Sequence, residues 1–410
     1  MAAGSERYER VLGFSDVVVH PIQEQPHPAR FRGGPEWPHF ESQILARQCW
    51  GPVPVPVDLR PHPARPDFPY FDPDRLLSPR YRSRQYWRAL LPRRAPQQPE
   101  SWIEKADAGI WCGGVSSHFG VMIANFAMRL AASSRSDPAV PLVFSLRLGG
   151  EPEPFFWRIV DHFGIDRRRV MLIRKPTRFT RLAVYPQAER PLGGGPSREY
   201  LAAMDRIAAA LPPLAAAPPS LFVSRSHMGR GTFAGEAYLD RAMAAAGIEV
   251  FHPQGEDLST QLRHYREARR LVFSEGSALY GLQLLGHVPA ELAVLTRRPG
   301  TRLAFASLRA RARSLRYLNA VRGVIHGLNR NGRPVLAKGI SVVDERRLLA
   351  GLGAVGIDLA AVWEQDAYIA QRDADIAAWM ADRLAAPVHP GERSRVEACL
   401  SRLSLSHLRV

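Results

Sequence analysis

The chain has 410 residues, of which 46% are hydrophobic, so it has apolar material for roughly two or three domains and is not a disordered protein. Its formal net charge of +16 favours an anionic partner, such as phosphate, nucleic acid or an acidic membrane surface, although nucleotide bias in a genome can also enrich Arg. Its three cysteines lack zinc or disulfide spacing, and no stretch reaches the roughly 18–20 apolar residues of a membrane span.

Residues 1–100 are rich in Pro, Arg and aromatic side chains, which predicts an irregular region with short strands and loops. A strand is expected at 16–20 and a short helix at 80–94. Asp72 and Asp74 have the DxD spacing of some metal sites, but they stand between prolines, so a loop is the favoured interpretation. The first ten residues lack the apolar core of a signal peptide, which together with the absence of a span predicts a cytoplasmic protein.

Between residues 101 and 211 strand patterns alternate with helical patterns, which predicts a first α/β domain. Ser116 and Ser117 are suitable N-caps for a helix from His118 to Ala132. A segment rich in Pro and Ala at 212–219 is expected to link this domain to the next. The other expected elements are strands at 110–112, 140–146, 170–173 and 182–185 and helices at 155–163 and 198–210.

Residues 220–345 are predicted to form a second α/β domain, because strands and helices alternate again. Gly247 is placed to end a helix in the left-handed conformation. Ligands of parallel sheets bind beyond the carboxyl ends of the strands, and polar segments follow two strands, at 224–231 and 274–278. We therefore expect the binding site there. The expected elements are strands at 221–223, 248–251, 271–273 and 292–295 and helices at 235–246, 259–270 and after 279.

The last part of the chain is expected to be largely helical. Residues 301–326 carry six arginines among apolar residues and are predicted to be helical or nearly so, and 335–343 to be strands. Residues 345–386 are mainly helical in pattern, with Trp363 and Trp379 expected to pack. Residues 346–410 are predicted to pack back toward the first domain. Asp373 and Asp375 lie in this helical pattern, so neither DxD pair predicts a metal site.

Several motifs of the second domain occur in a familiar order. Ser224-Arg225 ends a strand, a Gly/Arg turn and Glu236 follow, and Gly247 precedes the next strand and Pro253. Leu258-Ser259-Thr260-Gln261 begins a helix, and Glu275-Gly276-Ser277-Ala278-Leu279 follows a strand. In this order and spacing, they resemble glycosyltransferase family 61, whose bacterial capsule and lipopolysaccharide members carry Glu-Gly-Ser-Ala at the last position.

A fifth motif lies upstream. His118-Phe119-Gly120, followed by Arg129-Leu130, is similar to the Asn-Phe-Gly-His-Phe…Arg-Leu helix of that family. Val121 stands where many members have His, and Asn125 stands at an acidic position. The resemblance covers about Gly109–Gly286.

The resemblance implies two Rossmann-like domains facing a cleft, the B-type glycosyltransferase fold, with 101–211 on the acceptor side and 220–345 binding the nucleotide-sugar donor. It also implies inverting transfer of a sugar from a nucleotide-sugar donor to a hydroxyl of a glycan or lipid-linked acceptor in surface polysaccharide synthesis. Inversion is a single displacement, in which a base takes the acceptor proton while a diphosphate leaves. No metal or other cofactor is expected, because cations and backbone N–H groups at a helix N-terminus can meet the leaving charge.

Arg225 is the principal candidate for donor binding, because its planar guanidinium binds phosphate oxygens in pairs. The small residues of the turn after the third strand allow phosphate or ribose to approach the backbone, unless the turn is simply tight. Glu275 either accepts hydrogen bonds from sugar hydroxyls or caps the next helix, and both interpretations stay open. The donor-binding candidates are Arg225, His227, Arg230, Glu275, Gly276, Ser277 and Ala278.

The catalytic base is less clearly indicated. His118 opens a helix, and a neutral imidazole can accept a proton near pH 7, but a capping or surface role fits the pattern equally well. A carboxylate of the first region, Asp72 or Asp74, is an alternative.

Two other functions remain open. One is a nucleotide-sugar epimerase on the same fold, which needs additional acid/base carboxylates near the strand ends. The other is a non-catalytic protein that binds a nucleotide sugar or another anion. Nucleic acid is not an expected partner, because no reading module is recognisable. The arginines of 302–322 and 80–88 predict peripheral contact with an anionic membrane at the inner face, unless they are only solvated.

Overall fold

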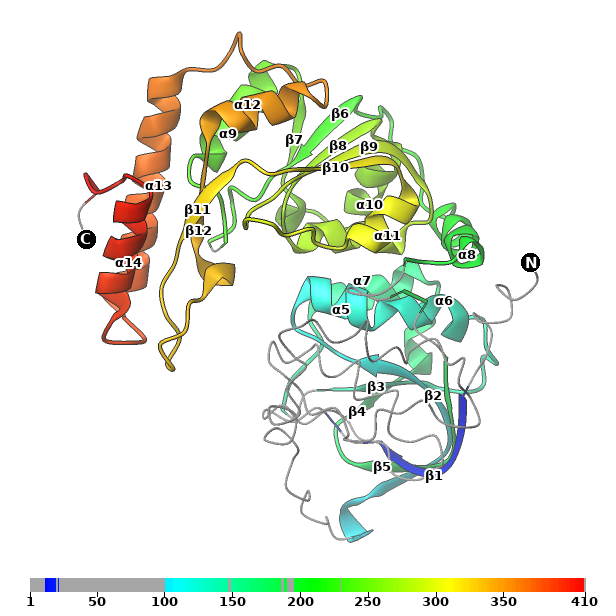
Figure 1. Ribbon diagram of the computed structural model, residues 1–410. Helices are drawn as coiled ribbons and strands as arrows, with labels where there is room; N and C mark the ends of the chain where they lie inside the picture. Colours follow the sequence, from blue (N-terminus) through cyan, green and yellow to red (C-terminus); the bar gives the residue numbers. More distant parts are fainter. Residues whose placement is uncertain are drawn as a thin grey trace, which may run out of the picture. The chain divides into compact units, whose positions relative to one another are not determined.

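The computed structural model describes residues 12–19, 21, 100–146, 149–185, 188–189, 195–229 and 231–408. The chain divides into two compact units. The first comprises Met1–Pro212, Tyr280–His287 and Ala306–Arg311, and the second comprises Pro213–Leu279, Val288–Phe305 and Ala312–Val410. Each unit is built on a mainly parallel sheet (Figure 1), which confirms the α/β prediction. Asp72, Asp74 and the basic stretch at 80–94 lie outside the described residues.

The first sheet has the strand order β1-β5-β2-β3-β4. Its four strands β5, β2, β3 and β4 are parallel, and β1 pairs with β5 in the antiparallel direction. The second half of β2, residues 109–114, is buried throughout, as expected of a strand covered on both faces. The strands are β1 Leu12–Val19, β2 Glu104–Gly114, β3 Leu142–Ser145, β4 Val170–Ile173 and β5 Thr177–Val184.

The predicted helix from His118 to Ala132 is wrong as a continuous element. It is divided into α5 (Phe119–Asn125), a 3₁₀ turn η3 (Ala127–Arg129) and α6 (Leu130–Ser133). The break is at the fully buried Phe126, which has φ −126° and ψ −45°. Tertiary packing of this ring therefore overrides a pattern that favours one helix. The other helical elements are η2 Glu100–Trp102, α7 Pro154–His162, η4 Arg167–Arg169 and α8 Arg198–Ala208.

The second sheet has the strand order β10-β9-β8-β6-β7, and all of its pairs are parallel. Gly247 follows α9 with φ +76°, which confirms the predicted left-handed helix end. The strands are β6 Ser220–Val223, β7 Glu249–Phe251, β8 Arg270–Ser274, β9 Val288–Leu295 and β10 Ala312–Leu318. The helical elements are α9 Glu236–Ala245, η5 Pro253–Gly255, α10 Leu258–Glu267, η6 Ser277–Leu284 and α11 Phe305–Arg311.

The predicted helix over residues 301–326 is also wrong. Only α11 is helical; β10 and β11 (Val321–Ile325) follow it, and β11 pairs with β12 (Ile340–Val343) in the antiparallel direction. β10 extends the parallel sheet as an edge strand beside β9, so long-range pairing decides its conformation. Of the strands expected at 335–343, only β12 forms, after a 3₁₀ turn η7 (Leu336–Lys338).

The C-terminal helices are α12 (Glu345–Gly353), α13 (Gln365–Ala385) and α14 (Glu392–Arg402). Figure 1 shows α13 and α14 side by side next to β11 and β12, and α13 also packs on α9 within the second unit. Trp363 and Trp379 both pack as expected: Trp363 contacts the Tyr238 and Tyr368 rings, and Trp379 covers a buried cluster. The packing of these helices toward the first domain stays a prediction. Within the described residues no helix is long and apolar enough to span a membrane.

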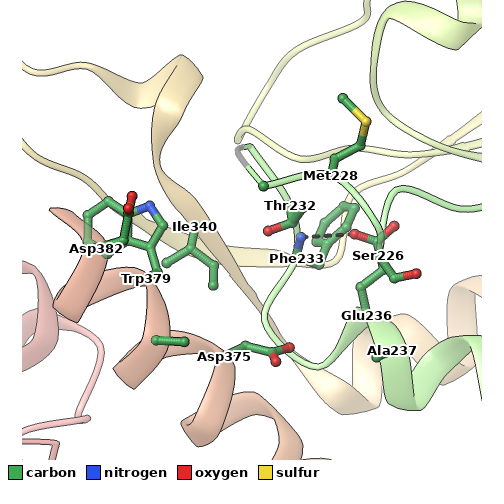
Figure 2. A pocket seen from close by; sticks show the side chains of 12 residues that line it. Ser226, Met228, Thr232, Phe233, Glu236, Ala237, Ile340, Asp375, Trp379 and Asp382 are labelled. Carbon is green, nitrogen blue, oxygen red and sulfur yellow. Dashed lines mark hydrogen bonds between the residues drawn. The ribbon is translucent and has the colours of Figure 1, made fainter. Parts of the chain in front are cut away.

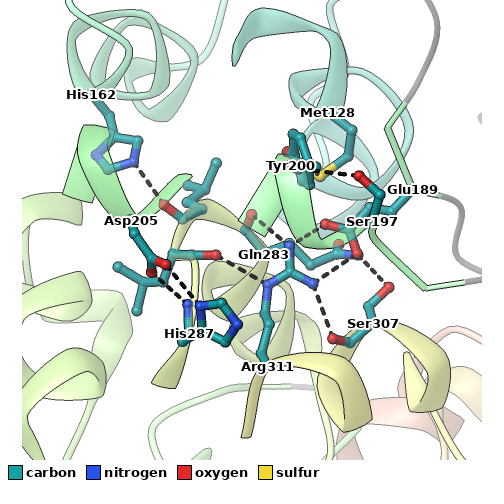
Figure 3. Close-up of polar contacts among 12 residues, drawn as sticks. Met128, His162, Glu189, Ser197, Tyr200, Asp205, Gln283, His287, Ser307 and Arg311 are labelled. Carbon is teal, nitrogen blue, oxygen red and sulfur yellow. Dashed lines mark hydrogen bonds and ion pairs between the residues drawn. The ribbon is translucent and has the colours of Figure 1, made fainter. Parts of the chain in front are cut away.

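Two short segments from the second half of the chain belong to the first unit, and a buried polar network holds them there (Figure 3). Arg311 forms a two-pronged ion pair with Glu189, and both side chains are almost completely buried. Gln283 donates to the Glu189 carboxylate over 3.1 Å and to the Ser307 hydroxyl over 2.9 Å. Outside this buried network, Asp205 accepts two further hydrogen bonds of 2.7 Å from the exposed His287. The predicted range of the second domain, 220–345, includes both segments.

Candidate functional site

The candidate site lies at the carboxyl edge of the second sheet. β9, β8 and β6 are parallel neighbours, so the residues that follow them meet at one edge. Arg225 follows β6 and Glu275 follows β8, as the sequence predicts. Arg297 and Arg298 follow β9. Three guanidinium groups and one carboxylate therefore come from three strand ends.

Arg225 is held close to the backbone of this edge. Its backbone N–H donates to Oε1 of Glu236 over 2.9 Å, and its Nε donates to the carbonyl of Gly231 over 3.3 Å. Its guanidinium lies directly over Gly276, where a Cβ atom would be 2.2 Å from Nη1. Burial lowers the pKa of Arg225, an effect that the charges of Glu236 and Glu275 oppose. The glycine of the predicted phosphate turn thus makes room for Arg225.

Arg297 is the most deeply buried cation of the site, with 7% of its surface exposed. Its backbone N–H donates to Glu275 over 2.8 Å, and a Cβ atom on Gly231 would lie 3.0 Å from its Nη1. Burial, followed by the charges of Arg298 and Arg225, lowers the pKa of Arg297 to about 10. Within the described residues its Nε is buried without a hydrogen-bond partner, as is the Nε of Arg298. The site therefore holds concentrated positive charge with unused donors.

Glu275 is the carboxylate that holds Arg297 and Arg298 in place. Its carboxylate accepts hydrogen bonds from the Arg297 backbone over 2.8 Å, the Thr301 hydroxyl over 2.7 Å and the Arg298 guanidinium over 2.6 Å. Burial alone would raise the pKa of Glu275, but the hydrogen bond and charge of Arg298, aided by the other two donors, bring it below its usual value. Both oxygens are thus engaged in holding the turn after β9. These contacts are neither hydrogen bonds from a sugar nor a cap of the following helix, the two roles considered for Glu275 from the sequence.

Glu236 fastens the turn after β6 in the same manner. It is 1% exposed and accepts backbone N–H groups from Arg225 and from Phe233, the second over 3.1 Å. Burial raises the pKa of Glu236, and the N–H groups offset this only in part. Glu236 is therefore a buried organiser of the turn rather than only an acid of the first helical turn.

The other predicted residues have diverse surroundings. Ser277 and the buried Ala278 begin a 3₁₀ helix, η6, instead of the predicted helix, in keeping with Gly281 and Gly286, which lower helix propensity. His227 is exposed, and its ring stacks on His252 at a centroid distance of 3.8 Å. Arg230 lies outside the described residues.

His118, the predicted base, is exposed and belongs to the first unit. It is the N-cap of α5, where its Nδ1 accepts a hydrogen bond from the Val121 N–H over 3.3 Å. The nitrogen that carries the lone pair is therefore engaged in capping. To take a proton from an acceptor there, the imidazole would have to release Val121.

Arg297 and Arg298 were missed by the sequence predictions, although a signal was present. They follow Thr296 directly after a strand that the apolar pattern of Leu292–Leu295 predicts. Applying the strand-end rule to this fourth strand, as to the first and third, would have found them.

The edge is suited to binding phosphate groups. Arg guanidinium groups bind phosphate oxygens through charge-assisted, often paired hydrogen bonds. At this edge three guanidinium groups lie near only two carboxylates, Glu236 and Glu275. The oxygens of both carboxylates already accept hydrogen bonds from protein groups. Among the residues that the structure describes, no group of three His, Cys, Asp or Glu side chains could hold a metal ion.

The model of the family described as Glycosyltransferase 61 matches residues 78–286. The chain belongs to glycosyltransferase family 61. The protein is accordingly a glycosyltransferase, and its substrates are a sugar donor and an acceptor. The family match ends at residue 286, so it includes Arg225 and Glu275 but not Arg297 or Arg298. No curated protein matches the chain.

Proposed function

We propose that this family 61 glycosyltransferase takes its sugar from a nucleotide-sugar donor and binds the donor diphosphate with Arg225, Arg297 and Arg298. The observation that supports the proposal is the convergence of the three guanidinium groups at one sheet edge. A diphosphate would supply anionic oxygens that balance the mutual repulsion of the three guanidinium groups. The growing charge of the leaving group would meet cations already held in place.

A titration calorimetry experiment with UDP, GDP and CMP tests donor binding. Arg225→Ala is expected to weaken binding of the preferred nucleotide by about 1.5–3 kcal/mol, the scale of hydrogen bonds to charged groups. Arg225→Lys should recover only part of this, because a point charge cannot form the paired contacts. Equal affinities for the parent and the alanine variant would assign Arg225 to the fold alone.

The proposed reaction is an inverting single displacement that needs no divalent metal. The guanidinium cluster supports this proposal, since it can neutralise the leaving diphosphate. Transfer should then continue in EDTA at the rate seen with added manganese. Loss of activity in EDTA and its return with manganese would contradict the metal-independent mechanism.

His118 remains the proposed base. His118→Asn retains a capping side chain but removes the imidazole, so the fold should persist while turnover falls by about 100-fold or more. An unchanged turnover would leave His118 with the capping role only.

We further propose a glycan or lipid-linked acceptor of surface polysaccharide synthesis, with the protein working at the inner face of the cytoplasmic membrane. The support is the Glu275-Gly276-Ser277-Ala278 sequence, which resembles that of bacterial members of the family. Radiolabelled sugar should then enter the solvent-extracted lipid fraction or a polymer when membranes supply the acceptor. Label that stays in free sugar alone would contradict this proposal.

A further inference from the structure

A cavity of the second unit, distinct from the strand-end site, lies between the turn after β6 and the helix α13, with a volume of about 250 Å³. It is smaller than the roughly 300–1,000 Å³ of sites for drug-sized ligands, so it suits a single ring rather than a nucleotide. Figure 2 shows Trp379 and Asp382 of α13 on one side of it and Ser226 and Glu236 on the other.

One face of α13 supplies an aromatic ring between two carboxylates. Asp375, Trp379 and Asp382 are separated by four and three residues, so they share a helix face that lines the cavity. The Trp379 indole N–H donates to the carbonyl of Lys338 over 3.1 Å, which fixes the orientation of the ring. Ile340, Met228 and Phe233 add further apolar lining.

The two aspartates differ in their availability. Asp375 accepts the Gly235 N–H over 2.8 Å and a Gln371 side-chain N–H over 2.9 Å, so it supports the turn. Asp382 is exposed and, among the described residues, has no hydrogen-bond or ion-pair partner. Its carboxylate is therefore ready to accept hydrogen bonds at the cavity.

The charge of the cavity opposes that of the strand-end site. Its described lining residues include the carboxylates of Asp375 and Asp382 and the almost fully buried Glu236, whose pKa burial raises, and no basic side chain. A phosphate would be repelled here, although the chain as a whole has a net charge of +16. Hydroxyl groups, which donate hydrogen bonds to carboxylates, are compatible with this lining.

We propose that this cavity binds one neutral sugar ring of the acceptor, with the apolar face of the ring on Trp379 and a hydroxyl donating to Asp382. A pyranose has an apolar C–H face and a rim of hydroxyl donors, and these match the indole and the carboxylate respectively. The inference rests on the proposed transferase function and names a part of its acceptor.

Saturation-transfer NMR with methyl glycosides tests the proposal on the whole protein. The probes are the methyl glycosides of glucose, galactose, xylose and N-acetylglucosamine, with methyl glucuronide as the anionic comparator and tetramethylammonium as a cationic one. At least one neutral glycoside should bind more strongly than both comparators. Asp382→Asn should weaken that binding by about tenfold, because the hydrogen bond loses its charged acceptor.

Trp379→Leu should abolish glycoside binding, and Asp366→Asn, an exposed carboxylate of α13 outside the cavity, should leave it unchanged. Trp379 also packs on a buried cluster, so Asp382→Asn, at an exposed position, provides the test if the leucine variant does not fold. UDP affinity should stay the same in all three variants.

Three results would overturn the inference: no neutral glycoside binds, a charged comparator binds better, or Asp382→Asn and Trp379→Leu bind glycosides like the parent. UDP binding separates this inference from the donor-site proposal. If the parent binds UDP but no glycoside, only the sugar cavity is wrong. If it binds glycosides but no nucleotide, only the donor site is wrong.

Discussion

Two sets of arginines in this protein have opposite electrostatic surroundings, and each contains an arginine that is buried. In the first unit Arg311 contacts both oxygens of Glu189 and also donates to backbone carbonyls, so its charge is balanced. At the edge of the second sheet, Arg225, Arg297 and Arg298 share two carboxylates that are already occupied by protein donors. Burial alone therefore does not distinguish a structural arginine from a ligand-binding one. The difference is whether the protein itself completes the hydrogen bonds and neutralises the charge.

The largest expected effect is the loss of stability when the ion pair between Glu189 and Arg311 is broken. Glu189→Gln should lower the free energy of unfolding by about 3–5 kcal/mol, because it leaves the buried Arg311 without its counter-charge. Urea denaturation measures this loss, with the exposed Glu397→Gln as the matched control. Replacing both partners, as Glu189→Leu with Arg311→Met, should recover much of the stability. A loss below about 1 kcal/mol for Glu189→Gln would show that Arg311 is not balanced by this contact.

Arg297→Met should weaken nucleotide binding without lowering the free energy of unfolding. UDP affinity should fall by about 1.5–3 kcal/mol, roughly 10- to 150-fold, while the free energy of unfolding stays equal or increases, because a poorly compensated buried charge is removed. Calorimetric titration and urea denaturation measure the two quantities, with the exposed Arg309→Met as control. A variant that unfolds readily but binds UDP normally would place Arg297 in the structural class with Arg311.

The contribution of Glu275 to stability depends on pH. Its pKa is lowered from the ordinary value of 4.5, so its contribution to stability is present above that pH and is lost as the pH falls through the folded-state pKa. Glu275→Gln should therefore cost about 1–2 kcal/mol at pH 7, and the gap to the parent should narrow below pH 4.5. Urea denaturation at several pH values checks this. A gap that does not change with pH would mean that the carboxylate charge is not what stabilises the turn.

The smallest expected effect is the loss of nucleotide affinity when the space beside Arg225 is filled. Gly276→Ala would bring a Cβ atom within 2.2 Å of Nη1, so the flexible guanidinium must move. We expect UDP affinity to fall by about 1 kcal/mol, roughly fivefold, with little change in stability. Gly255→Ala, which meets no atom within 4 Å, is the control in the same titration. Normal affinity for Gly276→Ala would show that the position of this guanidinium does not matter for the nucleotide.

Local sequence patterns were sufficient to predict the elements whose conformation depends on neighbouring residues. Apolar runs bounded by polar residues predicted β4 and β6 almost to the residue, and Gly247 predicted the end of α9. The order of short motifs indicated family 61 and selected Arg225 and Glu275 at the correct strand ends. Such features depend on the chemistry of a few neighbouring residues, so they can be read without the rest of the chain.

Other elements and contacts depend on partners that are distant in the sequence. Residues 312–318 become an edge strand because β9 offers unpaired backbone groups, and their Arg-rich pattern indicated a helix instead. Arg311 belongs to a buried ion pair because Glu189, 122 residues earlier, lies beside it. Glu275 holds Arg298 and Thr301 because β8 and β9 are neighbours in the sheet. The roles of these charges depend on side chains that only folding brings within hydrogen-bond distance, so no local pattern could assign them.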